Sequence, residues 1–160
     1  MSTTTATPQL LHRPATAGDM YVGPGDLYRF LVTGAESGGA YFAMEALVPP
    51  GGGPPPHIHT REDETFYVLE GTCEFLLADR RVPAGPGDFV NVPRGQVHCF
   101  HNAGTGVARL ILTFTPAGME HFFTETLERA TSMDMPVPDN IDAVVARYVE
   151  AAPRHGMTFL

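Results

Sequence analysis

Apolar residues along the chain occur in short runs that alternate with polar positions and are separated by glycine and proline. Short alternating runs between tight turns are typical of an antiparallel all-β domain. We predict strands over residues 27–33, 40–48, 65–69, 72–78, 88–92, 97–100 and 107–115. The number and spacing of these strands favour a closed or sandwiched architecture such as a jelly-roll β-barrel.

The period of the apolar positions changes after Pro116, where two segments take up helical spacing. The apolar face of the first is formed by Met119, Phe122, Phe123, Leu127 and Ala130, and that of the second by Ile141, Val144, Val145, Tyr148 and Ala152. The second helix should begin near Asp139 and Asn140, which are good capping residues, and end at Pro153. We expect both apolar faces to pack against the barrel as core.

These patterns divide the chain into three parts. Residues 1–20 are expected to form an N-terminal arm, either poorly ordered or extended, and residues 21–116 the barrel. Residues 117–160 are expected to form a helical extension packed on the barrel.

Composition and charge narrow the class of protein. Of the 160 residues, 43% are hydrophobic and 18% charged, which is typical of a globular domain. The formal charge of −8 argues against nucleic acid or an anionic membrane as a partner. The sequence has neither an apolar run of membrane-spanning length nor a secretory signal pattern at its start, so a cytoplasmic location is expected. It contains no lysine, which excludes Schiff-base chemistry through that residue.

The stretch PPPHIHTREDETFYVLEG, residues 54–71, carries the strongest candidate chemistry. Because side chains alternate along a strand, His57 and His59 should point to the same face, close enough to share one ion. Glu64 is the favoured carboxylate, since it is in phase with the following strand. Glu62 shares that phase but should lie within the turn, and Asp63 is out of phase.

A third imidazole is expected from His98, which follows a Pro-Arg-Gly turn at the start of another predicted strand. Three imidazoles and one carboxylate suit a borderline transition metal such as Fe, Mn, Co, Ni, Cu or Zn rather than Ca or Mg. His57, His59, Glu64 and His98 are thus candidates to bind one divalent transition metal per chain. An ion of higher coordination number would keep open positions.

The sequence resembles the cupin superfamily through two motifs. The first, G-x5-H-x-H-x4-E-x6-G, is matched by Gly51, His57, His59, Glu64 and Gly71. The second, G-x5-P-x-G-x2-H-x3-N, is matched by Gly87, Pro93, Gly95, His98 and Asn102. This resemblance implies a small jelly-roll barrel, and it implies that the three histidines and the glutamate are metal ligands.

Residues 54–71, the segment VPRGQVHCFHN and the phrase TPAGMEHFF resemble bacterial quercetin 2,3-dioxygenase-like monocupins. That likeness implies a dioxygenase acting on a phenolic or flavonol-like aromatic substrate, with Glu64 taking the hydroxyl proton as base as well as ligand. An apolar pocket for such a substrate is predicted from Phe66, Val68, Phe75, Phe100, Leu112 and Phe114.

Two other functions remain open at this point. Small cupins also serve as cyclases in aromatic polyketide biosynthesis, so the same metal could act without dioxygen in a cyclase, isomerase or lyase. The barrel could also be a non-enzymatic module that binds a small molecule. In each case we expect a homodimer, because Tyr67 and Leu69 are apolar residues on the outward face of their strand.

Overall fold

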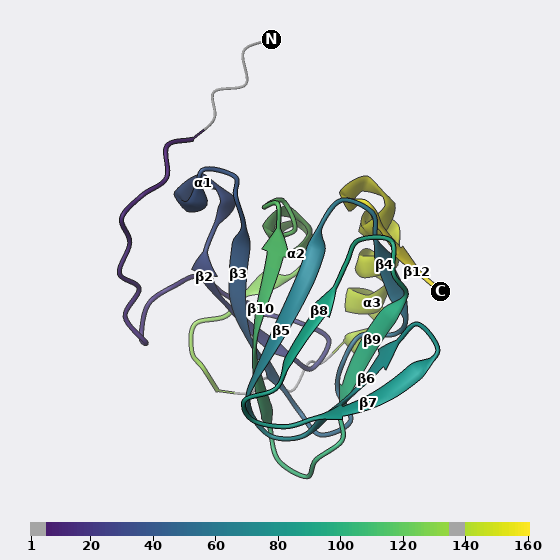
Figure 1. Cartoon of the computed structure of the whole chain (residues 1–160). Helices are drawn as coiled ribbons and strands as arrows, with labels where there is room; N and C mark the ends of the chain where they lie inside the picture. Colours follow the sequence, from purple (N-terminus) through teal and green to yellow (C-terminus); the bar gives the residue numbers. More distant parts are fainter. Residues whose placement is uncertain (1–5, 135–139) are drawn as a thin grey trace.

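Two antiparallel sheets face each other and enclose the apolar core, as Figure 1 shows for a computed structural model of the chain. The structure describes residues 6–134 and 140–160. In this part of the chain, the larger sheet has the order β11-β1-β2-β3-β10-β5-β8 and the smaller the order β12-β4-β9-β6-β7. The predicted all-β jelly-roll barrel with C-terminal helices is therefore confirmed.

The strands of the larger sheet are β1 (Met20–Val22), β2 (Leu27–Val32), β3 (Phe42–Val48), β5 (Asp63–Glu70), β8 (Phe89–Val92), β10 (Ala108–Thr115) and β11 (Glu128–Arg129). Those of the smaller sheet are β4 (His57–His59), β6 (Cys73–Leu77), β7 (Arg80–Ala84), β9 (His98–Asn102) and β12 (Met157–Phe159). The helical elements are α1 (Gly34–Ser37), α2 (Glu120–Thr126), α3 (Ile141–Ala151) and the 3-10 helix η1 (Ala152–His155).

Alternation of side chains explains why the predicted strands form this core. Along β10, Leu110, Leu112 and Phe114 are buried, and the residues between them are half-buried. Aromatic rings from both sheets meet inside the barrel, for example Phe66 and Phe75 with ring centroids 5.1 Å apart. Each such fully buried side chain stabilises the fold by about 1.5–3 kcal/mol.

The first C-terminal helix ends earlier than predicted. α2 ends at Thr126, the backbone of Leu127 is extended, and β11 pairs with β1. The backbone N–H of Ala130 donates to the carbonyl of Met20 instead of continuing a helix. The prediction that the helical face runs on to Ala130 was therefore wrong, because the edge of the larger sheet offers the Ala130 backbone another partner. The Leu127 N–H still donates to the carbonyl of Phe123, and the Leu127 side chain is buried in the core as expected.

The second C-terminal helix begins as expected. The Asn140 side chain accepts a hydrogen bond from the backbone N–H of Ala143, and Asp139 lies outside the described residues. The expectation that its apolar face is all core was wrong in part. Val144 and Tyr148 pack against the core, but Ile141 and Val145 are 46% and 44% exposed.

Both ends of the chain contribute more than the sequence suggested. The described part of the N-terminal segment lies along α1 and β2, since Gln9 N–H donates to the carbonyl of Glu36 and Arg13 Nε donates to that of Leu31. The C-terminal residues add β11 to one sheet and β12 to the other. Residues 117–160 are thus part of the sheets as well as a helical cover.

Candidate metal centre

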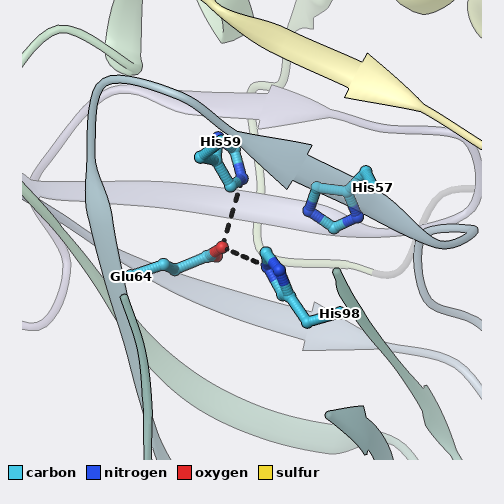
Figure 2. Close-up of side chains that lie close together, drawn as sticks. All are labelled: His57, His59, Glu64 and His98. Atoms are coloured by element: carbon cyan, nitrogen blue, oxygen red, sulfur yellow. Dashed lines mark hydrogen bonds and ion pairs between the residues drawn. The ribbon is translucent and has the colours of Figure 1, made fainter. Parts of the chain in front are cut away.

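The two sheets bring four buried polar side chains together in the interior of the barrel (Figure 2). His57 and His59 lie on β4, and His98 lies on β9, where it pairs directly with His57. Glu64 comes from β5 in the opposite sheet and points inward in the same phase as Phe66. All four side chains are buried. Because side chains alternate along a strand, the inward-facing positions of β4, β5 and β9 point into the same space between the two sheets.

The ligand atoms of these residues converge. One atom from each of His57, His59, Glu64 and His98 lies within 4.8 Å of the others. Glu64 Oε2 is 2.9 Å from His98 Nε2 and 3.2 Å from His59 Nε2, the two interactions drawn in Figure 2. A metal ion held at about 2.0–2.2 Å from nitrogen and oxygen ligands needs such convergence.

Backbone carbonyls fix the orientation of two of the imidazoles. The Nδ1–H of His57 donates to the carbonyl of Pro55 at 2.9 Å, and the Nδ1–H of His98 donates to that of Gln96 at 3.1 Å. Each carbonyl belongs to the residue two positions earlier in the chain. These bonds leave Nε2 as the ligand atom of both rings, which is how metal-binding histidines are usually oriented. The residues present therefore fit a transition metal.

The electrostatics of the cluster follow from burial and pairing. Burial is the main cause that lowers the pKa of His57 to about 4, so this imidazole is neutral at physiological pH. Burial alone would raise the pKa of Glu64, but hydrogen bonds from His59 and His98 lower it to about 2. Burial opposes the charge of His98, but its bond to Glu64 outweighs burial and raises its pKa.

The neighbouring acidic residues lie outside the cluster. Asp63 points outward as expected and forms an ion pair with Arg94, with Oδ1 3.0 Å from Nε. Glu62 does lie in the turn, but it is only 4% exposed and its Oε2 has no hydrogen-bond partner among the described residues. Burial raises the pKa of Glu62. The sequence pattern located this carboxylate correctly but did not reveal its burial.

An apolar cavity of about 60 Å³, here called the inner cavity, adjoins the cluster and is lined in part by His57, His59 and Glu64. Of the predicted pocket residues, four line it: Phe66, Phe100, Leu112 and Phe114. Val68 and Phe75 are fully buried in the core and do not line the inner cavity. Both residues point inward along their strands as predicted, but the alternation of side chains does not tell how far from the metal ligands an inward residue lies.

Much of the inner cavity's wall is formed by residues outside the predicted pocket. Tyr28, Met44, Met119, Phe122, Phe123, Tyr148, Met157 and Phe159 also line it. The helical pattern indicated buried faces for Met119, Phe122, Phe123 and Tyr148. No signal in the sequence indicated that Met157 and Phe159 reach the site.

Among the residues that the structure describes, no helix has the length and apolar character needed to cross a membrane. The cytoplasmic location stays a prediction.

Comparison with known proteins agrees with the fold and the site. Residues 44–114 match the family model of the Cupin domain. Quercetin 2,3-dioxygenase of Bacillus subtilis is 26% identical over 106 residues, which cover 66% of this chain and 31% of the relative. Germin-like protein 5-1 of rice is 44% identical over 75 residues, covering 42% of this chain and 33% of the relative. The chain thus matches about a third of the length of each of these relatives.

A solved structure of an RmlC-like cupin from Shewanella frigidimarina superimposes with a TM-score of 0.58 at 22% identity. The match covers 72% of this chain and 99% of the other. At this identity the likeness concerns the fold. Residues 44–114, which match the Cupin domain model, form a cupin domain, and the double-sheet barrel and the convergent His-His-Glu-His cluster agree with that match.

Proposed function

We propose that this protein is a metal-dependent dioxygenase that acts on a phenolic, flavonol-like aromatic substrate. The observation that carries the proposal is the convergence of His57, His59, Glu64 and His98 within 4.8 Å at the wall of an apolar cavity. These four residues would hold one divalent transition metal. When bound, such an ion supplies Lewis acidity and positions for small ligands.

The chain's own residues have separate roles in this proposal. Glu64 is the candidate proton acceptor, because its carboxylate lies on the cavity wall where a phenolic hydroxyl would bind. The neutral His57 needs no deprotonation before it acts as a ligand. The aromatic side chains Phe66, Phe100 and Phe114 exclude water and offer ring faces to an aromatic substrate.

The similarity to quercetin 2,3-dioxygenases of Bacillus subtilis and Aspergillus japonicus supports dioxygen as the co-reactant. The size of the inner cavity is consistent with this. A volume of about 60 Å³ accommodates only a few water-sized molecules, which suits a small co-reactant beside the metal.

An oxygen-independent cyclase, isomerase or lyase is the second candidate. The local identity to a germin-like protein is 44%, higher than the 26% identity to the Bacillus dioxygenase, so sequence similarity does not single out one reaction. The same four ligands and apolar wall would serve such a reaction. Binding of a small molecule without turnover is the outcome expected if neither reaction occurs.

The test begins with metal analysis of the purified protein, followed by reloading with Fe, Mn, Co or Ni. Oxygen uptake is then measured with quercetin as the phenolic probe. We expect one metal per chain and oxygen consumption in step with loss of quercetin. His59→Ala should abolish both metal binding and oxygen consumption. His101→Ala is the matched control, because His101 lies on β9 beside the cluster but outside it.

Turnover at an undiminished rate under strict anaerobiosis would overturn the dioxygenase assignment and favour the second candidate. A protein that retains no metal after loading would overturn the metal site itself.

A further inference from the structure

A second and larger hollow adjoins the inner cavity. This outer cavity has a volume of about 520 Å³ and lies between the glycine-rich loop 51–55 and α3. Four residues line both cavities: Tyr28, Pro54, Tyr148 and Phe159. The two spaces are therefore neighbours that share a wall. A volume of this size falls within the range of about 300–1,000 Å³ that is usual for small-molecule sites.

The outer cavity contains a carboxylate that is not fully paired. Asp26 is only 4% exposed, and its Oδ2 accepts a hydrogen bond from the Tyr28 hydroxyl at 2.9 Å. Its other oxygen, Oδ1, has no partner among the residues that the structure describes. The buried hydroxyl of Tyr148, on the same cavity wall, likewise has no partner within residues 6–134 and 140–160.

Two other buried carboxylates of this protein, Glu45 and Glu120, have partners on both oxygens. Glu45 accepts from Arg29 with one oxygen and from Arg109 with the other. Glu120 accepts from the backbone N–H of Gly34 and of Gly118. Glu62 also has an oxygen without a partner among the described residues, but it does not line the outer cavity. Leaving a buried polar group without a partner costs about 1–3 kcal/mol, so the unpaired oxygen of Asp26 at this cavity calls for a ligand.

The rest of the wall is apolar and open to solvent at its rim. Ile141, Val145 and Val149 of α3 are 46%, 44% and 57% exposed, and Leu160 beside them is 67% exposed. Exposed apolar residues gathered around one hollow mark a binding site rather than a random surface. Their chemistry favours a ligand with an apolar body.

We propose that the outer cavity binds the body of an aromatic ligand that carries a hydroxyl group, which Asp26 and Tyr148 recognise together. The ligand hydroxyl donates to Asp26 Oδ1, and its oxygen accepts from the Tyr148 hydroxyl. This inference rests on the proposed function, because it assigns the larger part of the substrate to the outer cavity and only its reacting end to the inner one. The inner cavity, at about 60 Å³, is too small for a whole aromatic molecule.

Two matched probes test the recognition. 2-Naphthol has a hydroxyl that can donate, whereas 2-methoxynaphthalene has an oxygen that can only accept. Binding is measured by fluorescence titration of the metal-free and the metal-loaded protein. We expect wild type to bind 2-naphthol about tenfold more tightly, because only this probe donates to the Asp26 carboxylate.

The variants separate the two contacts. Asp26→Asn should weaken 2-naphthol about tenfold and leave 2-methoxynaphthalene unchanged. Tyr148→Phe should weaken both probes several-fold, because both accept from its hydroxyl. Val145→Trp should reduce binding of both probes by filling the space. Tyr41→Phe is the control, since Tyr41 is exposed and lines neither cavity.

Equal affinity of wild type for the two probes, or an unchanged preference in Asp26→Asn with normal thermal unfolding, would overturn the inference. Tyr148→Phe removes a single oxygen, so it provides a second test if Asp26→Asn does not fold. Metal content and oxygen uptake are measured separately. If the protein binds the probes as expected but neither retains metal nor takes up oxygen, the proposed function is refuted and the binding site remains. If the protein retains metal and takes up oxygen but does not bind the probes as expected, only the binding site is refuted.

Discussion

Phe159 pairs in antiparallel register with His57, and the two rings lie 5.9 Å apart between centroids. The pairing joins β12 to β4, the strand that carries two of the four candidate metal ligands. Phe159 also lines both cavities. One side chain therefore lies beside a metal-site imidazole and forms part of the wall of both cavities.

Phe159→Ala should weaken metal binding roughly tenfold, because groups that orient a ligand commonly contribute this much to affinity. Metal titration with a competing chelator measures the change. Thr158→Ala is the control, since Thr158 is exposed on the same strand. Equal metal affinity of Phe159→Ala and wild type would contradict this role of the ring.

His98→Ala and His57→Ala should both lose metal but should differ in the stability of the metal-free protein. His98 forms a hydrogen bond with Glu64, whereas His57 has no such bond to this carboxylate in the described part of the chain. Removing His98 leaves a buried charge with one fewer partner, at a cost of about 3 kcal/mol or more. His57→Ala should lower the free energy of unfolding by less. Denaturant unfolding compares the free energies, and equal losses would refute the pairing argument.

Glu64→Gln should retain part of the metal affinity but lose turnover. The amide keeps the size and one oxygen ligand of the carboxylate but cannot accept the proton of a phenolic hydroxyl at neutral pH. Metal content and oxygen uptake are measured on the same sample. Asp63→Asn, an adjacent carboxylate outside the cluster, is the control. A full rate in Glu64→Gln would remove the proton-transfer role.

Asp26→Asn should stabilise the protein above pH 6 but not below pH 4. Burial raises the pKa of Asp26 from 3.8 to about 6 in the folded state. The folded protein therefore binds more protons than the unfolded chain between these values, and stability falls as pH rises through this window. At neutral pH the cost is on the order of 3 kcal/mol.

Thermal unfolding across pH 4–8 checks this prediction. Wild type should lose stability relative to Asp26→Asn as pH rises, and parallel curves for the two proteins would contradict it. A residue that costs stability in the folded state is typical of a site kept for binding.

We also expect a homodimer that uses the outer face of the larger sheet. Tyr67 on β5 and Phe89 on β8 are cross-strand partners, 42% and 62% exposed. Tyr67→Arg combined with Phe89→Arg should convert a dimer to a monomer, as measured by sedimentation. Tyr41→Arg, at an exposed tyrosine elsewhere, should not. A monomeric wild type would show that this apolar pair does not serve self-association.

The local order of residues predicted three of the four candidate ligands and the strands β2, β3, β5, β6, β8, β9 and β10. Alternation is a property of neighbouring residues, so the phases of His57, His59 and Glu64 could be read directly, and so could the outward direction of Asp63. The motif spacing added His98, although no local rule brings β9 to β4.

Only the tertiary structure decided what surrounds these ligands. Phe159 reaches His57 from about a hundred residues away in the chain, and no periodic pattern specifies such a pairing. Helical spacing identified an apolar face on α3 but could not show that Val145 lines a solvent-open cavity instead of the core. The burial of Asp26 and Glu62 likewise depends on elements that pack over them, which is a property of the assembled barrel and not of the sequence around each residue.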